Sequence, residues 1–300
     1  RPLNVVDDRI EVLENIDLEK FDDCMKLVEG SDYVIHSAGK ICHPSEVPTD
    51  FRIALNQVTL VSNLLESCHK SGVKRFVDIN SSTGYPNREH PITEDEYWDD
   101  EPYISYYGYG WSRRYREKMM EHLSHFSDMK ILICRGTAMF GPYDNFDTES
   151  AMVIPSLINK FIKGKKGTVE VWGDGSNIRD FIYSSEVARA MLLIMLKKPK
   201  LPINIGSGKG VSIKKIVKII NKYFGNNYKI LWNKKYLGGD KKRVLDITRL
   251  KKLGFKQETN LENAIYQTIN WFKNNRYKKN EKYKLLIPGF AIPSQPNLIK

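Results

Sequence analysis

Short apolar runs alternate along this chain with longer segments in which apolar residues recur every three or four positions. The runs at 33–36, 75–79 and 130–134 are typical of buried parallel strands. The segments 17–30 and 55–70 have the periodicity of amphipathic helices. Because a strand–helix–strand order places parallel strands side by side with helices against the sheet, the sequence predicts a doubly wound α/β fold.

The pattern changes after Pro142. A helix is expected before it, at 112–125, and the polar residues 143–150 predict a loop. Beyond the loop we expect helices at 151–164, 184–197, 211–224 and 261–274, and strands at 168–172 and 202–206. These elements alternate less regularly than those of the first half, which indicates a second, smaller lobe.

Small or hydroxyl residues follow three of the predicted strands. Gly39, Ser81 and Gly136 all stand at such strand ends. Open α/β sheets bind their ligands at the carboxyl ends of the strands, so we expect these residues to border a ligand site.

Tyr109 and Arg113 are four residues apart, so a helix would carry them on one face. A free phenol ionises only near pH ~10, and a fixed cation beside a phenol favours the phenolate. A hydroxyl such as that of Ser81 would complete a group able to exchange a proton with a substrate hydroxyl. This combination is typical of tyrosine-based dehydrogenases.

Six short motifs extend this similarity. They are found at 33–39, 81–86, 135–142, 172–175, 179–183 and 204–208. In order and spacing the chain resembles the extended short-chain dehydrogenase/reductase superfamily, in its NAD-dependent epimerase/dehydratase (nucleotide-sugar epimerase) branch, from about Asn15 to about Arg276. The resemblance implies a Rossmann-like sheet with a smaller α/β substrate lobe.

For catalysis, the resemblance implies that Ser81 binds the reacting oxygen and that Tyr109 exchanges the proton. Tyr107 is the alternative tyrosine, and Ser81 could instead cap a helix. Arg113 stands where the family has a lysine that binds the nicotinamide ribose. Arginine keeps the charge but cannot relay a proton.

The cofactor implied is NAD or NADP. Asp17 corresponds to the family's acid that accepts from the adenine amino group, although it could also be a helix N-cap. The family's asparagine on the next helix corresponds to Asn56 or Gln57, and we take Asn56. The residues expected to bind cofactor are Asp17, Leu18, Ala38, Gly39, Asn56, Tyr109, Arg113 and Gly136.

The family's opening strand and its Gly-x-x-Gly-x-x-Gly turn have no counterpart in this sequence. That turn cradles the cofactor pyrophosphate at a helix N-terminus. The sequence begins at Arg1, close to where the family's second strand ends. We therefore expect a fragment that lacks the first β-α-β unit.

The substrate implied is a nucleoside-diphosphate sugar. Arg179 and Arg243 resemble the pair that grips the diphosphate, for which forked guanidinium groups are well suited. Thr83 and Asn204 are further expected contacts. Met152 takes the place of a histidine that acts in 3,5-epimerisation in fucose-synthase-like members, which counts against that reaction. Ser82-Thr83 replaces the acid pair of the 4,6-dehydratases, which disfavours dehydration.

The expected domain division follows from the resemblance. A partial nucleotide-binding domain would comprise 1–148 and 180–206, and a substrate-binding lobe 149–179 and 207–275. The remaining residues, 276–300, would form a tail, either loosely docked or an arm in a homodimer.

The composition indicates which classes of partner and which cellular compartment to expect. The net charge is +11, but the lysines are spread over the second half, so no nucleic-acid partner is expected. The longest apolar stretch, 190–196, is far shorter than the ~20 residues of a membrane span. Four separated cysteines and six scattered histidines indicate neither a disulfide framework nor a metal site, and favour the cytoplasm.

The sequence thus predicts an NAD(P)-dependent epimerase or reductase of a nucleoside-diphosphate sugar. The alternative is a non-catalytic binding protein on the same fold, which the missing phosphate turn and the arginine at 113 would suit.

Overall fold

The computed structural model describes residues 3–4, 9–39, 51–147, 151–164, 167–235, 239–275 and 283–284. The first and last described segments are two short strands. They are β1 (Leu3–Asn4) and β12 (Tyr283–Lys284), which pair in parallel. The rest of the predicted 276–300 tail lies outside the described residues.

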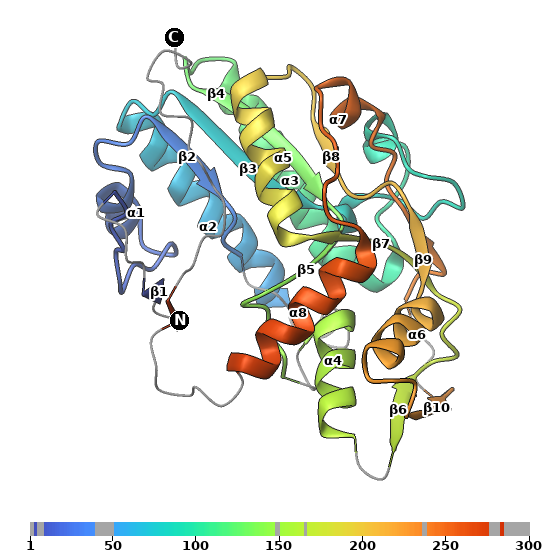
Figure 1. Ribbon diagram of the computed structural model, residues 1–300. Helices are drawn as coiled ribbons and strands as arrows, with labels where there is room; N and C mark the ends of the chain where they lie inside the picture. The colour runs from blue at the N-terminus through green and yellow to red at the C-terminus, as the bar shows by residue number, and fades with distance from the viewer. Residues whose placement is uncertain are drawn as a thin grey trace.

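One sheet of the molecule has four parallel strands (Figure 1). Its strands, in spatial order, are β2 (Tyr33–His36), β3 (Arg75–Ser81), β4 (Lys130–Gly136) and β8 (Ile203–Ile205). The register pairs Ser81 with Gly136, so two of the expected strand-end residues are neighbours. All four of these strands were predicted at their observed positions to within two residues.

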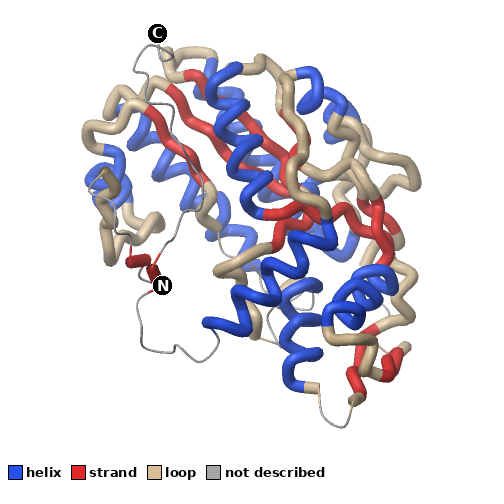
Figure 2. The backbone as a smooth tube through the Cα atoms, in the orientation of Figure 1, coloured by secondary structure: helices blue, strands red, loops and turns tan. Residues whose placement is uncertain are grey.

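Helices cover both faces of this sheet, as Figures 1 and 2 show. On one face lie α1 (Phe21–Val28), α2 (Phe51–Lys70) and α3 (Tyr107–Ser124), and on the other lies α5 (Ser184–Lys197). One apolar core fills the space between the first three helices and the sheet, and another lies beneath α5. The prediction of a doubly wound α/β fold is confirmed.

The remaining strands form two further sheets outside the first one. A mixed sheet contains β5 (Ala138–Phe140), β7 (Ile178–Tyr183), β9 (Gly210–Ser212) and β11 (Lys242–Arg243), and β6 (Thr168–Trp172) pairs with β10 (Lys229–Asn233). The helices here are α4 (Val153–Lys163), α6 (Ile213–Tyr223), α7 (Thr248–Lys252) and α8 (Leu261–Asn275). A separate apolar core joins α4, α6 and α8 to β5, β6 and β7. The exact domain limits remain a prediction.

Three helix starts were predicted wrongly by four residues or more, including that of α2, which begins at Phe51 rather than at Leu55. The helix expected from Asp17 begins at Phe21, so Asp17 is not its N-cap. The Asp17 carboxylate instead accepts from the backbone of Glu19 at 3.0 Å, which closes a local turn before the helix. The helix expected from Ser112 begins at Tyr107, which places Tyr109 inside it.

Three short 3₁₀ helices were not predicted from the sequence. They are η1 (Ser82–Gly84), η2 (Glu94–Trp98) and η3 (Ile104–Tyr106), of which η1 and η3 contact α3. Within the ranges given above, no helix is long and apolar enough to cross a membrane.

The cysteines behave as the sequence indicates. Cys24, Cys68 and Cys134 are free and completely buried. Burial raises the pKa of the Cys24 thiol to about 11 and that of Cys68 to about 12, so both remain thiols. Cys42 lies outside the described residues. No group of His, Cys, Asp and Glu in the described part of the chain could hold a metal ion.

Candidate active site

The first two turns of α3 bring Tyr109 and Arg113 into direct contact. The guanidinium of Arg113 donates to the phenol oxygen of Tyr109, and its Cζ lies 4.5 Å from the centre of the Tyr109 ring. Arg113 is only 7% exposed, whereas Tyr109 is partly open to solvent. The expected helical pairing is confirmed, with the guanidinium buried and the tyrosine partly exposed.

The end of β3 supplies two hydroxyl groups. Ser81 Oγ accepts from the Thr83 backbone at 3.2 Å and from the Thr83 hydroxyl at 3.0 Å, so Ser81 caps η1. Ser81 accepts in both of these bonds, and its own hydroxyl proton is therefore still available to a reacting oxygen. The capping and catalytic interpretations of Ser81 are compatible.

Gly110 allows the turn and the helix to meet. A Cβ at this position would lie 2.7 Å from the Thr83 carbonyl oxygen and 2.5 Å from Cβ of Pro102. Only glycine permits so close an approach. The start of α3, with Tyr109, is thereby packed against the turn that carries Ser81 and Thr83.

The two arginines expected at the diphosphate lie side by side. Arg179 on β7 and Arg243 on β11 are partners in the strand register. Asp240, only 1% exposed, lies between them, with ion pairs of 2.9 Å to Nη2 of Arg179 and 2.7 Å to Nε of Arg243. Residues 64 positions apart thus form one cluster, as the resemblance implied, but with an acid that the sequence analysis missed.

Arg243 also connects this cluster to the catalytic turn. Its Nη1 donates to the Ser82 carbonyl at 3.3 Å, and its Cζ lies 4.9 Å from the Tyr106 ring centre. Burial raises the pKa of Tyr106, although the charge of Arg243 opposes that shift. The arginine pair and the Ser81–Tyr109 group therefore border one site.

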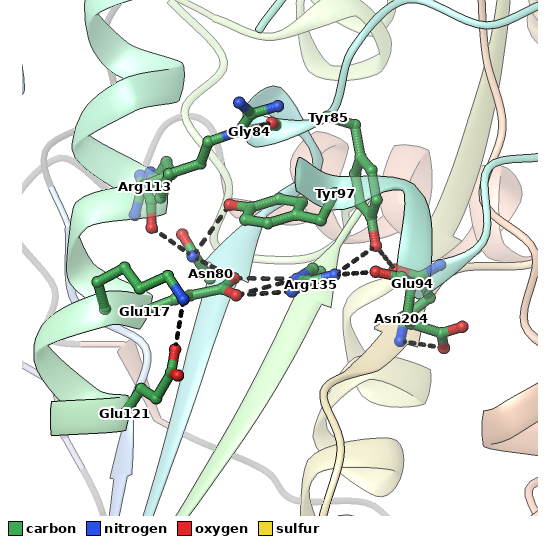
Figure 3. A network of polar contacts seen from close by, with 12 residues as sticks. Asn80, Gly84, Tyr85, Glu94, Tyr97, Arg113, Glu117, Glu121, Arg135 and Asn204 are labelled. Carbon is green, nitrogen blue, oxygen red and sulfur yellow. Dashed lines mark hydrogen bonds and ion pairs between the residues drawn. The ribbon is translucent and has the colours of Figure 1, made fainter. Parts of the chain in front are cut away.

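A buried polar network anchors α3 to the sheet (Figure 3). Arg135 on β4 donates to both carboxylate oxygens of Glu117, at 2.7 Å from Nη2 and 3.0 Å from Nε. Asn80 donates to Glu117 at 2.8 Å and to the Arg113 carbonyl at 2.9 Å. Burial alone would lower the pKa of Arg135, but Tyr85 and Glu117 raise it, so the guanidinium stays charged.

Asn204 belongs to this network rather than to an open surface. It has no exposed surface, and its amide oxygen accepts from Tyr85 at 2.6 Å. Its amide nitrogen donates to the carbonyls of Ile92 and Asp246. Because all its hydrogen-bonding groups are used internally, we do not include Asn204 in the proposed site.

The residues expected at the cofactor lie at several strand ends. Ala38 and Gly39 are exposed beyond β2, whereas Gly136 is buried beside Ser81. Gln57 Oε1 lies 3.3 Å from where a Cβ of Gly39 would be, so Gln57 rather than Asn56 lies against that turn. Asn56 is partly exposed on the same helix.

Leu18 packs with the apolar core of α1 and α2, and its carbonyl accepts from Asn63 at 3.1 Å. Asp17 beside it is exposed. Tyr107, the alternative tyrosine, is an exposed residue at the first position of α3, two residues before Tyr109.

The comparisons with known proteins identify the family of the chain. The family model described as "NAD dependent epimerase/dehydratase family" matches residues 3–206. The chain belongs to this family. The family resemblance and the expectation of an NAD-type cofactor are confirmed.

Relatives at the 25–28% level carry the names of nucleotide-sugar enzymes. A probable GDP-L-fucose synthase 1 of Oryza sativa subsp. japonica is 28% identical over 254 residues, which cover 81% of this chain and 76% of that protein. Among solved structures, a UDP-glucose 4-epimerase of Thermotoga maritima is 25% identical, with a TM-score of 0.79 over 90% of this chain and 86% of that one.

A third relative was solved with a cofactor. The GDP-L-fucose synthetase of Naegleria fowleri bound to NADP is 25% identical, with a TM-score of 0.78 over 89% of this chain and 84% of that chain. Because these relatives are named as enzymes, they do not favour the non-catalytic alternative.

Proposed function

We propose that this protein transfers a hydride between NAD(P) and a sugar carbon of a nucleoside-diphosphate sugar, as a reductase or an epimerase. The observation that carries the proposal is the contact of Arg113 with the Tyr109 phenol beside the Ser81–Thr83 turn. A phenol oxygen held by a fixed cation is suited to exchange a proton with a sugar hydroxyl. The Ser81 hydroxyl would donate to the same oxygen.

The residues around Arg113 fit a nicotinamide nucleotide. Nε of Arg113 is buried, and nothing in the described part of the chain accepts a hydrogen bond from it. A ribose hydroxyl would satisfy this donor, and the exposed Ala38–Gly39 turn would border the dinucleotide. When bound, the nicotinamide supplies or accepts the hydride. Tyr109 and Ser81 would move and hold the proton.

Arg179 and Arg243 would bind the substrate diphosphate. Nη2 of Arg243 is buried without an acceptor among the described residues, and Arg179 keeps part of its guanidinium exposed. Asp240 balances one of the two charges, so the pair carries about one net positive charge toward an anion. Thr83 would add a neutral contact near the sugar.

Two positions favour reduction or 4-epimerisation: Met152 counts against 3,5-epimerisation, and Thr83 counts against dehydration. Met152, the N-cap residue of α4, carries a thioether in place of an acid–base group and is exposed. Thr83 donates its hydroxyl proton to Ser81. Neither side chain can take a proton from carbon at neutral pH, so the proposal does not include that step.

A direct assay tests the proposal. The native full-length protein is mixed with NADH or NADPH and a 4-keto sugar linked to GDP or UDP, and consumption of the reduced cofactor is followed. In parallel, UDP-glucose and UDP-galactose are tested for interconversion. If neither series shows turnover above a Tyr109→Phe control, the proposed function fails.

Nucleotide binding gives a separate prediction. Arg179→Met should weaken GDP or UDP binding about 10- to 100-fold, since a hydrogen bond to a charged group contributes ~1.5–3 kcal/mol. Binding of the monophosphates should weaken less, because they have one phosphate fewer to contact. Isothermal titration calorimetry measures both, and Lys222→Met on α6, which removes an exposed cation of the same lobe, is the matched control. An equal loss in both variants would argue against a diphosphate site.

We also propose a homodimer. Apolar side chains on α2 and α3 are exposed, among them Leu55, Trp111 and Tyr115. Such residues on two adjacent helices suit a contact with a second copy of the chain. We expect sedimentation equilibrium to give twice the chain mass and Tyr115→Glu to give the monomer. A native monomer at micromolar concentration would contradict this.

The cytoplasm is the compartment that the cysteines favour. Three free thiols lie buried in two cores, where oxidation would disrupt packing. We therefore propose a reducing compartment for the protein, and fractionation of native cells tests this.

A further inference from the structure

A second arginine lies beneath the Tyr109–Arg113 contact. Arg116 is on the same inward stripe of α3, seven residues after Tyr109, and is 1% exposed. It donates through Nη2 to Oδ1 of Asp78 and through Nη1 to Gln57 at 3.4 Å. The inner face of this helix thus carries two buried cations in succession.

Asp78 is the carboxylate that faces these cations. It lies on β3, is 0% exposed, and pairs in the strand register with His36, whose Nδ1 is 2.7 Å from the same Oδ1. Burial by itself would raise the pKa of Asp78, but the charges of Arg116 and Arg113 and the hydrogen bond from His36 hold it below its usual value. Asp78 is therefore charged at neutral pH.

The geometry of this pair differs from that of an ion pair that only holds elements together. Glu117 and Arg135, two turns away from Tyr109, share three hydrogen bonds through both carboxylate oxygens. Asp78 instead uses one oxygen, and its Oδ2 is buried without a hydrogen bond from any described residue. Nε of Arg116 is likewise without a described acceptor. The Asp78–Arg116 pair therefore leaves a hydrogen-bonding atom of each partner unused. Its two buried charges, by contrast, balance each other.

Three buried side chains in this part of the molecule are charged. Arg113 and Arg116 carry one positive charge each, and Asp78 carries one negative charge. Arg113 contacts the Tyr109 oxygen directly, and Arg116 lies two turns from Tyr109 on the same inward stripe of α3, so the charge of Arg116 also acts on the phenol. Without Asp78, two buried guanidinium groups would act together on the phenol; without Arg116, Asp78 would cancel much of the effect of Arg113.

We propose that Asp78 and Arg116 form a charge-setting pair, in which Asp78 neutralises Arg116 and leaves Arg113 as the one net cation acting on the Tyr109 phenol. Neither residue needs to touch substrate; both act through α3. The proposal rests on the function proposed above for Tyr109, but its electrostatic content can be measured without turnover.

Three other polar side chains surround this pair. From β2 comes His36, from β4 the buried thiol of Cys134, and from α2 the uncharged amide of Gln57. Burial raises the pKa of Cys134 well above its usual value, so this thiol stays neutral. Glu117, also on α3, is already paired with Arg135. His36 is the remaining ionisable group in contact with Asp78. A separate variant, His36→Gln, therefore tests its effect on Tyr109.

The test is a spectrophotometric titration of tyrosinate formation in the native full-length protein. Each variant is titrated alone and with Tyr109→Phe added, and the difference isolates the phenol of Tyr109. The variants are Asp78→Asn, Arg116→Met, the double variant with both changes, and His36→Gln. Lys118→Met is the control, because it removes an exposed cation from the outer face of the same helix. Circular dichroism establishes that each variant is folded.

Opposite shifts are expected from the two single variants. Asp78→Asn should move the midpoint of the Tyr109 signal about one pH unit down, and Arg116→Met about one unit up, since a nearby charge shifts a titration by this order. The double variant should return close to the native midpoint. Lys118→Met should leave the midpoint unchanged. Arg116→Lys, which keeps the charge, should also have a midpoint close to the native one.

The double variant keeps the test decisive if a single variant fails to fold, because it removes both buried charges together. A double variant whose midpoint differs from the native one by as much as a single variant would overturn the proposal. So would shifts of the same sign, or unchanged midpoints in folded single variants. A shift produced only by His36→Gln would assign the effect to the imidazole instead. Opposite shifts in a protein without turnover would uphold the charge-setting pair and reject the proposed function.

Discussion

Tyr109→Phe should lower kcat about 10²- to 10⁴-fold, the range expected when a positioned proton-exchanging group is removed. Cofactor affinity should change little, because the ring remains over the Arg113 guanidinium at its 4.5 Å separation. Only the oxygen that accepts from Arg113 and exchanges the proton is lost. Steady-state rates with a keto nucleotide sugar, together with a fluorescence titration of NADPH, measure the two effects separately.

Two neighbouring variants are the controls for this result. Tyr107→Phe removes an exposed phenol two residues away and should leave kcat near the native value. Arg113→Lys keeps a cation one helical turn from the phenol, so it should retain most of the rate. If Tyr109→Phe stays active while Tyr107→Phe does not, the proton-exchanging role belongs to Tyr107.

The elements with strong periodicity could be predicted from the sequence, two of them with their ends, whereas the ends of others could not. The helix at 184–197 and the strand at 168–172 were predicted with their observed limits. The start of α3 was not, because two glycines and no capping side chain precede Ser112. What makes residues 107–111 helical is the packing of Gly110 against Pro102 and Thr83, a tertiary contact with no local signal.

The same limit applies to the site. The Tyr109–Arg113 contact follows from helical spacing, and the resemblance indicated the pairing of Arg179 with Arg243. Asp78 and Asp240, which balance these cations, were missed because they are distant in sequence or lie in segments without periodicity. Buried acids of this kind become evident only when strand register places them beside an arginine. One signal was available: the helical stripe of Tyr109, Arg113, Arg116 and Met120 contains charged residues where core residues are expected.

Breaking the Glu117–Arg135 pair should cost about 3–5 kcal/mol of unfolding free energy, because it leaves an uncompensated charge in the interior. Glu117→Gln removes the partner of a guanidinium that is almost completely buried. Arg135→Met additionally loses the contact of the guanidinium with the Tyr97 ring, whose centre is 3.6 Å from Cζ. Urea unfolding followed by circular dichroism measures both losses.

A double variant distinguishes the pair from the rest of the network. Glu117→Leu combined with Arg135→Met removes both charges, so its loss should be smaller than that of either single variant. Some loss should remain, because Asn80 then keeps its bond to the Arg113 carbonyl but loses the carboxylate. Since Asn80 connects β3 to the residue that holds Tyr109, this variant should also show a lower kcat at temperatures where it is fully folded. A fully folded double variant with native kcat would show that the network stabilises the fold without positioning α3.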